Sequence, residues 1–445
     1  MTTQPWTPEQ ILDADKKYVI HSWSTQGTLN PKVITGGEGS WFWDSTGKRT
    51  LDFQSQLVNL NLGHQHPKLV EAIATAAREM CYIGPNYAVE SRSKLAAKMA
   101  EIAPGDLTMS FFTTGGAAAN ETAVRLARHV TGRSKVIARY RSYHGATAGA
   151  LQLTGDPRRW AAEPFVGGVV RMLDPDVYRL AEDNPVNQGA PHLEEILQYE
   201  NPETVAAIII EPVTGTNGVL YPPQNYLAEL RRVCDKYGII LIFDEVMVGF
   251  GRTGTMFASE HWGVVPDIMT SAKGINSGYV PLGVMTVNEA IGEWLQTNYF
   301  WGGQTYAGHP LACASGVAAL DIMDEEKILE NLAPVASYFG EQLEVLRDKH
   351  PSVGDVRGKG AFWGVELVKN NDTKEPLVPF NAKGAANEAM VKVCGDANAK
   401  GLYLASNNNV LRLAPPLIIT REEIDFAVNI LDESLSIADT YTEER

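Results

Sequence analysis

The stretch GIILIFDEVMVGFGRTG at residues 238–254, followed by PDIMTSAKG at residues 266–274, contains two short apolar runs that each lead to a charged residue. Asp244 ends the first run and Lys273 ends the second. Apolar runs bounded by glycine and polar residues predict buried strands of a parallel sheet. Ligands of such sheets bind beyond the carboxyl ends of the strands. We therefore expect a carboxylate and an amine to meet at one edge of the sheet.

This pair of residues suits one cofactor in particular. Burial favours a neutral lysine, which is nucleophilic and can form an imine with an aldehyde. A buried carboxylate needs a cationic partner, and a protonated pyridine nitrogen would provide one. Pyridoxal phosphate offers both groups, with Lys273 at its aldehyde carbon and Asp244 at its ring nitrogen. From this stretch alone, an unrelated strand-end aspartate and a solvated surface lysine remain the alternative.

The composition excludes several classes of protein. The 445 residues, 44% of them apolar and 20% charged, are typical of a soluble globular protein with two or three domains. A net charge of −15 disfavours a nucleic-acid partner or an anionic membrane surface. The four cysteines lie far apart and predict neither disulfides nor a zinc site, which fits a cytoplasmic protein. No apolar run is long enough to span a membrane, and the N-terminus does not resemble a signal peptide.

Strands and helices alternate along most of the chain. Residues 1–35 predict a polar arm with a helix near 8–17, and residues 39–53 predict a hairpin. The middle of the chain predicts a parallel sheet with helices on both faces. Its expected strands and helices lie at 67–81, 134–140, 204–213, 225–237, 279–287 and 311–323. Beyond a change of composition near residues 324–326, we expect a long helix at 325–350, a strand pair at 354–367, a helix at 382–400, a strand at 410–416 and a last helix after Thr420.

A glycine turn stands between a strand and a helix at residues 111–121, FFTTGGAAANE. Glycines let the backbone approach a ligand, and the free N–H groups of a first helical turn attract anions. Gly115, Gly116 and Ala117 are therefore a candidate phosphate site, with a plain tight turn as the alternative. His64 and His66 lack a third ligand nearby, so the sequence predicts no metal site.

An aromatic residue follows the strand at 134–140. Tyr143 precedes His144 on the loop after this strand, and an aromatic ring there could stack on a flat heterocycle. A structural Tyr-His pair is the alternative. Glu211 precedes Pro212 at the end of the strand at 204–213.

Taken in order, these motifs resemble the class III pyridoxal-phosphate aminotransferases, the ω-aminotransferase group, from about Trp41 to Thr420. The segments that carry the resemblance are GGAAANE at 115–121, YHG at 143–145, EP at 211–212, FDEVMVGFGRTG at 243–254, AKG at 272–274 and TYAGHP at 305–310. The resemblance implies an α/β fold of fold type I, with a mostly parallel central sheet and a smaller α+β domain. It also implies an N-terminal arm with part of the small domain at 1–62, a large cofactor-binding domain at 63–325 and a small domain at 326–445.

The resemblance also implies roles for individual residues. Lys273 would form the Schiff base of a ping-pong reaction and act as acid and base, with Asp244 and Glu211 completing the catalytic set. The implied cofactor-binding residues are Gly115, Gly116, Ala117, Tyr143, His144, Glu211, Asp244, Val246, Lys273 and Thr305. Thr305 would reach the cofactor phosphate of a neighbouring subunit, which implies a homodimer or possibly a tetramer. Many relatives carry serine or threonine at the place of Ala117, so the phosphate would depend on backbone N–H groups and Thr305.

The substrates are expected to be an amino donor and a 2-oxo acid. Arg412 would bind the substrate carboxylate through its planar fork, and the candidate pocket walls are Trp23, Leu57, Val58 and Tyr82, with Gln56. Taurine, β-alanine and 4-aminobutyrate are the favoured donors, and pyruvate or 2-oxoglutarate the acceptor. Candidates for a second contact to an anionic donor are Arg141, Arg158 and Arg159. Three alternatives stay open. The first is an amine:pyruvate aminotransferase of broad amine scope, the second is a racemase, aminomutase or decarboxylating aminotransferase on the same scaffold, and the third is a non-catalytic binding protein that retains the fold.

Overall fold

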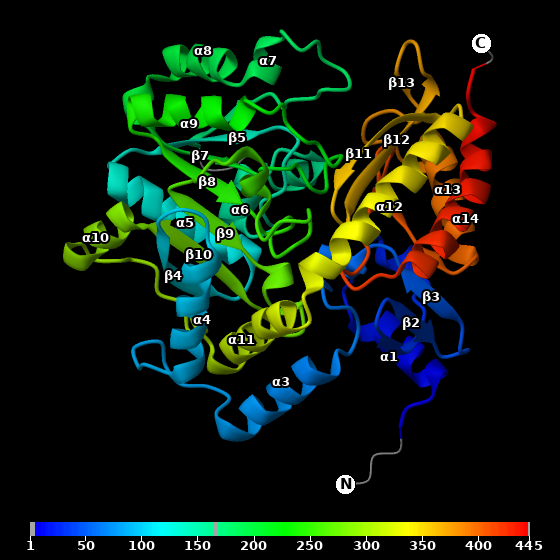
Figure 1. Ribbon diagram of the computed structural model, residues 1–445, viewed down its shortest axis with the longest axis horizontal. Coiled ribbons are helices and arrows are strands. Elements are labelled where there is room, and N and C mark those ends of the chain that lie inside the picture. The colour runs from blue at the N-terminus through cyan, green and yellow to red at the C-terminus, as the bar shows by residue number, and fades with distance from the viewer. Residues whose placement is uncertain (1–4, 164–166, 444–445) are drawn as a thin grey trace.

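The computed structural model describes residues 5–163 and 167–443. Within them, seven strands form a central sheet in the order β4-β10-β9-β8-β7-β5-β6 (Figure 1). The strands are β4 Leu107–Thr113, β5 Lys135–Arg139, β6 Val169–Met172, β7 Val205–Ile210, β8 Ile240–Asp244, β9 Ile268–Ser271 and β10 Gly283–Asn288. Strand β10 is antiparallel to β4 and β9, and the pairs from β9 to β6 are parallel. The predicted mostly parallel sheet is confirmed.

Helices cover both faces of this sheet. Helices α8 (Ala190–Glu200) and α9 (Tyr226–Tyr237) pack on one face, and α5 (Gly116–Thr131), α6 (Ala148–Leu153) and α10 (Glu289–Thr297) pack on the other. Alternate residues of β7 pack into the hydrophobic cores on opposite faces of the sheet. Ile208 and Ile210 face α8 and α9, whereas Ala207 and Ile209 face α5. Side chains of a strand alternate between faces, so a sheet buried on both sides needs continuous apolar runs.

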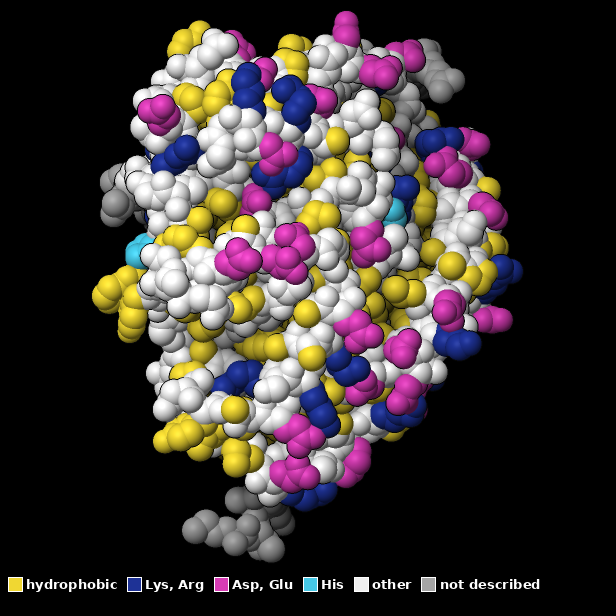
Figure 2. All heavy atoms as spheres, turned by 60° about the vertical axis from the view of Figure 1, so that its left-hand side comes forward, with side chains coloured by type: hydrophobic (Ala, Val, Ile, Leu, Met, Phe, Trp, Pro, Cys, Tyr) yellow, Lys and Arg dark blue, Asp and Glu magenta, His cyan; other side chains and the backbone are white. Residues whose placement is uncertain are grey.

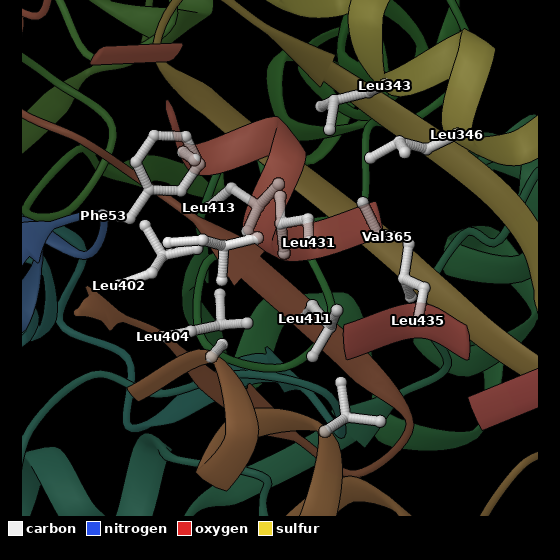
Figure 3. Packing of buried hydrophobic residues seen from close by; sticks show 14 of the residues in the cluster. Phe53, Leu343, Leu346, Val365, Leu402, Leu404, Leu411, Leu413, Leu431 and Leu435 are labelled. Atoms are coloured by element: carbon white, nitrogen blue, oxygen red, sulfur yellow. The ribbon is translucent and has the colours of Figure 1, made fainter. Parts of the chain in front are cut away.

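A second sheet lies at the C-terminal end of the chain (Figure 1). Its order is β11-β12-β16-β15, with β11 Val353–Lys359, β12 Phe362–Asn370, β16 Val410–Leu413 and β15 Ala405–Asn407; β13 (Glu375–Pro376) pairs with β12. Helices α12 (Ile328–Lys349), α13 (Glu388–Ala399) and α14 (Arg421–Asp439) cover it. Figure 3 shows leucines of α12 and α14 meeting leucines of β16 in this core. Thr420 and Glu423 form the predicted capping box that begins α14.

The N-terminal strands join the C-terminal part of the chain. Strands β1 (Ile34–Glu38), β2 (Trp41–Asp44) and β3 (Arg49–Asp52) form a sheet with β14 (Leu402–Tyr403), which pairs in parallel with β3. The predicted hairpin is the pair of β2 and β3. The segment that follows β3 reaches the carboxyl ends of the large sheet, where Leu57 and Asn59 line a cavity. The division of the chain at residues 62 and 325 stays a prediction.

Three of the remaining helices lie close to their expected positions: α1 Pro8–Tyr18, α3 Pro67–Glu79 and α11 Pro310–Glu325. Three others had no counterpart among the predicted elements: α2 Ser55–Val58, α4 Glu90–Ile102 and α7 Pro185–Gln188. Helix α12 begins after Lys327, whose left-handed φ of +50° separates it from α11. Helix α13 begins at Glu388, later than expected, because a 3₁₀ turn at Gly384–Asn387 precedes it. In the described part of the chain, no helix combines the length and apolar character that a membrane span requires.

Candidate active site

Strands β8 and β9 bring the two residues of the opening stretch together. Asp244 at the end of β8 is level with Thr270 of the neighbouring β9, and Lys273 follows three residues later. Both side chains line a cavity of about 440 Å³ at the carboxyl ends of the strands. The carboxylate and the amine therefore meet at one edge of the sheet, where parallel sheets bind ligands.

Three hydrogen-bond donors orient the Asp244 carboxylate. Oδ2 lies 2.7 Å from both His144 Nδ1 and Asn120 Nδ2, and Oδ1 accepts from the Val246 backbone N–H at 3.0 Å. Asn120 is itself fixed, because the Thr270 hydroxyl donates to its oxygen at 2.6 Å. These donors leave the carboxylate at the cavity surface in one fixed orientation.

Asn120 received no role from the sequence. It lies on α5 with 1% of its surface exposed, on the face that carries Ala119 and Ala123 into the core. A polar residue on the buried face of an amphipathic helix needs a hydrogen-bond partner. An asparagine on the apolar face of a predicted helix is the sequence pattern that would have identified Asn120 as a candidate site residue.

Lys273 is buried in a strained position. Burial lowers the pKa of its amine to about 8; Asp244 opposes this shift, and the positive charges of Arg412 and Arg158 add to it. Its φ of +43° is unusual for a residue other than glycine, and such strain is often found at functional sites. A lysine with this pKa is neutral far more often at neutral pH than a solvated one, so it can act as a nucleophile and base.

Glu211 links the end of β7 to the loop of Tyr143. Its carboxylate accepts from the backbone N–H of Tyr143 at 3.0 Å and of Gly215 at 2.7 Å. Burial raises the pKa of Glu211; His144 counteracts this shift and Asp244 adds to it. Glu211 and Tyr143 both line the cavity, so this carboxyl group holds the wall in place.

The glycine turn forms another side of the cavity. Gly115, Gly116 and Ala117 line it, and α5 begins at Gly116. The first N–H groups of a helix have no acceptor within the helix, so they can bind an anion. A Cβ atom on Gly116 would lie 2.7 Å from Val246 Cγ1, closer than side-chain atoms pack. Glycine at this position therefore leaves room between the turn and Val246, which also lines the cavity.

The three arginines near the Tyr143 loop differ in their surroundings. Arg141 pairs with Asp176 at 2.9 Å, and Arg159 pairs with Glu163 at 2.8 Å. Arg158 also has a partner, Asp156, but its guanidinium carbon lies 3.7 Å from the centre of the Tyr143 ring. Its charge also lowers the pKa of Lys273, so Arg158 is the one of these three that acts on the amine.

The predicted pocket walls are only partly brought together. Leu57 lines the cavity, whereas Val58 is 1% exposed and packs in a core with Val213 and Val219. Trp23 is exposed to solvent and does not line the cavity. Tyr82 also lies outside it, and its hydroxyl donates to the backbone carbonyl of Thr305 at 2.8 Å. Gln56 donates to Asp52 at 2.8 Å instead of facing the cavity.

Arg412 reaches the region from the C-terminal sheet. Leu411 and Leu413 on either side of it enter the core behind β16, so Arg412 lies on the opposite face of the strand. Burial lowers the pKa of its guanidinium to about 10. Arg412 does not line the cavity itself, but its charge is one of those that lower the pKa of Lys273. In the described ranges, no carboxylate forms an ion pair with Arg412, and its Nε lies 3.2 Å from Gln54 Oε1.

The family model for aminotransferase class-III matches residues 24–435. The chain is a class III aminotransferase. Among solved structures, the aminotransferase is similar to taurine:2-oxoglutarate aminotransferase from Bifidobacterium kashiwanohense in complex with pyridoxal phosphate and glutamate, at 40% identity and a TM-score of 0.94 over 98% of this chain and 99% of the other. It is also similar to an (S)-enantioselective omega-transaminase from Thermomicrobium roseum, at 37% identity and a TM-score of 0.91 over 98% and 100%. The taurine–pyruvate aminotransferase of Bilophila wadsworthia is 34% identical over 96% of this chain and 97% of the relative.

The aminotransferase is pyridoxal-phosphate dependent, as class III enzymes are, and its cavity fits this cofactor. The cavity offers a buried amine for an aldehyde, a carboxylate for a ring nitrogen and free N–H groups for a phosphate. A volume of about 440 Å³ suits a small aromatic cofactor. The expected fold type and cofactor are thus confirmed.

Proposed function

We propose that this enzyme transfers the terminal amino group of an ω-amino acid to a 2-oxo acid. Taurine, β-alanine and 4-aminobutyrate are the favoured donors, with pyruvate or 2-oxoglutarate as acceptor. The observation that carries the proposal is Arg412, a largely buried guanidinium without a carboxylate partner in the described part of the chain, close enough to Lys273 to lower its pKa. A buried charge needs a counter-ion, and the acidic group of each substrate would supply it.

The geometry of a guanidinium suits acidic groups. Its planar fork binds a carboxylate through two parallel hydrogen bonds, and charge-assisted bonds of this kind are the stronger ones. Arg412 Nη1 and Nη2 have no hydrogen-bond partner within residues 5–163 and 167–443, so both remain for a ligand. Arg158 behind Tyr143 is the second cation that an anionic donor would approach. The similarity to a taurine:2-oxoglutarate aminotransferase and to a taurine–pyruvate aminotransferase supports an anionic donor.

The chain's own residues then have distinct tasks. Pyridoxal phosphate, when bound, supplies the electron sink that stabilises the carbon from which a proton is removed. Lys273 would bond to the cofactor aldehyde and, once released, would act as the acid and base at the substrate carbon, which a pKa of about 8 permits. Asp244, oriented by His144 and Asn120, would hold the protonated ring nitrogen.

The other residues of the cavity would hold and orient the cofactor. Gly115, Gly116 and Ala117 would bind the phosphate through their N–H groups. Tyr143 and Val246 would contact opposite faces of the ring, and Glu211 would keep the Tyr143 loop in place.

A homodimer is part of this proposal. A groove of about 1100 Å³ runs between α3, α4 and α11, lined in part by Ala72, Met80 and Val317. Hydrophobic side chains also gather in several groups on the face in Figure 2, among acidic and basic ones. Exposed apolar surface of this extent marks contact sites in soluble proteins. The loop of Thr305 is fixed by Tyr82 and would reach the partner's cofactor phosphate.

The test is to add one donor at a time to the holoenzyme, without keto acid, and to follow the cofactor absorption. Amine transfer to the cofactor bleaches the band near ~410 nm and raises one near ~330 nm. We expect taurine, β-alanine or 4-aminobutyrate to act fastest, and Arg412→Ala to raise the KM of the keto acid at least about tenfold. Arg141→Ala, which removes a paired arginine from the Tyr143 loop, serves as the matched control.

Two other outcomes would redirect the proposal. Faster bleaching by simple amines than by acidic donors would favour the amine:pyruvate alternative, which agrees with the similarity to an omega-transaminase. Bleaching by none of these donors, with the cofactor band present, would contradict amino transfer from ω-amino acids and favour a racemase or aminomutase.

A further inference from the structure

Gln54 is a fully buried polar residue in contact with Arg412 that has no role so far. It follows β3 and has 0% of its surface exposed. Its side-chain amide contacts Arg412 twice: Oε1 accepts from Arg412 Nε at 3.2 Å, and Nε2 donates to the backbone carbonyl of Arg412. The two contacts match the two ends of an amide, one acceptor and one donor.

The position of Gln54 is itself fixed by neighbouring groups. Its backbone N–H donates to Asp52 Oδ1 at 3.2 Å, and Asp52, fully buried, also lies 2.9 Å from His64 Nε2. The next residue, Ser55, has a left-handed φ of +44° and donates its hydroxyl to the Ala414 carbonyl at 2.7 Å. The glutamine side chain therefore has little freedom to turn away from Arg412.

The amide of Gln54 is uncharged, and this determines whether Arg412 keeps its positive charge available for a ligand. A carboxylate at position 54 would pair with the guanidinium and cancel its charge, whereas an amide orients it and leaves the charge in place. A carboxylate would also place an oxygen against the Arg412 carbonyl, where Gln54 now has an N–H donor. Because Gln54 occupies only Nε, both Nη nitrogens stay without a partner in the described residues, on the face of β16 opposite the leucine core.

We propose that Gln54 is a positioning residue that holds Arg412 by its Nε and its backbone carbonyl, and so keeps an un-neutralised guanidinium ready for the acidic group of the substrate. This inference rests on the proposed role of Arg412 as the binding group for that acid. Gln54 thus favours acidic substrates without touching them. The amide would lower the KM of a keto acid and leave the chemical step at saturation almost unchanged.

The test compares three variants of the holoenzyme: Gln54→Met, which keeps the shape and removes both polar contacts, Gln54→Glu, which adds a charge, and Arg412→Ala. Binding of pyruvate and of 2-oxoglutarate is measured by calorimetry, together with KM and kcat for the acceptor that binds. We expect Gln54→Met to weaken binding about tenfold and Gln54→Glu about a hundredfold, with kcat changed less than about threefold. Gln224→Met, at an exposed glutamine, is the control for a loss of amide.

The outcomes separate the two proposals. If Arg412→Ala weakens binding but Gln54→Glu binds the keto acid as tightly as the natural protein, Gln54 has no positioning role. If Arg412→Ala leaves binding unchanged, the role of Arg412 itself is wrong. A variant that lowers kcat as strongly as it raises KM would point to a general structural defect and contradict the proposal. If Gln54→Met does not fold, keto-acid binding by the isosteric Gln54→Glu variant tests the proposal alone.

Discussion

Replacing Lys273 by methionine should stabilise the apoprotein, and it should do so most at low pH. Burial lowers the pKa of this amine from about 10.5 in the unfolded chain to about 8 in the fold. The folded protein therefore holds the proton less tightly than the unfolded chain. Between these two values the unfolded chain binds more protons, so the free energy of unfolding rises with pH.

The size of the effect follows from the shift. One pKa unit corresponds to about 1.4 kcal/mol, so the buried ammonium costs about 3 kcal/mol at pH 7. At pH 9.5, closer to the unfolded value, the remaining cost is about 1 kcal/mol. Methionine has a similar length and carries no charge. The free energy of unfolding of Lys273→Met should therefore exceed that of the natural protein, and the excess should be about 2 kcal/mol larger at pH 7 than at pH 9.5.

The measurement is denaturant unfolding of both apoproteins at the two pH values, at one protein concentration because the proposed dimer would also contribute to stability. Lys16→Met, on the exposed side of α1, controls for the loss of one positive charge. A difference between natural protein and Lys273→Met that is the same at both pH values would refute the depressed pKa. The proposed acid–base role of Lys273 would then lose its physical basis.

Three further predictions concern the cofactor contacts. Asp244→Asn should weaken cofactor binding and lower the rate of the donor half-reaction at least about a hundredfold, since the ring nitrogen loses its anionic partner; unchanged kinetics would exclude that role. Asn120→Leu removes one donor to Asp244 and should lower the same rate about tenfold; it also leaves the buried Thr270 hydroxyl without its acceptor, so the melting temperature, checked by calorimetry, should fall. Gly116→Ala should raise the cofactor dissociation constant about tenfold, because its methyl group would approach Val246 to 2.7 Å; equal affinity in a spectral titration would show that the turn can give way.

Much of the fold could be predicted from local patterns. Continuous apolar runs such as 205–210 and 239–243 indicated strands buried on both sides, and β7 and β8 are indeed covered by helices on each face. The reversal of β10 was beyond these patterns, because direction within a sheet is set by the connections and not by the apolar period. The pairing of β3 with β14 joins residues some 350 positions apart, and no local signal carries it.

The part of the site that lies directly after strands was also predictable. Asp244, Lys273, Tyr143, Glu211 and the glycine turn all follow strands of one sheet, so they meet where the strands end. Their motifs needed no knowledge of tertiary packing beyond the parallel arrangement.

The pocket wall after β3 was not predictable in the same way. Ser55, Gln56 and Val58 have φ values of +44°, +58° and +60°, so the usual alternation of side chains is lost there. Spacing from the Gly63–His64 motif could not tell that Leu57 faces the cavity and that Val58 enters the core. The same strained segment hides Gln54, whose partner Arg412 comes from the opposite end of the chain.

The balance of charges around the cavity supports the proposal of an acidic substrate. Asp244 has a cationic partner once the ring nitrogen is bound, and burial raises the pKa of Glu211, which makes it a weaker counter-charge. Lys273 loses its charge readily, so Arg412 remains as a largely buried cation near Lys273 that has no anionic partner in the described residues. A neutral amine or aldehyde would leave that cation uncompensated, whereas the acid group of an ω-amino acid or a keto acid would neutralise it. In the proposed ping-pong reaction, donor and acceptor never occupy the site together, so one guanidinium held by the neutral amide of Gln54 would serve both substrates in turn.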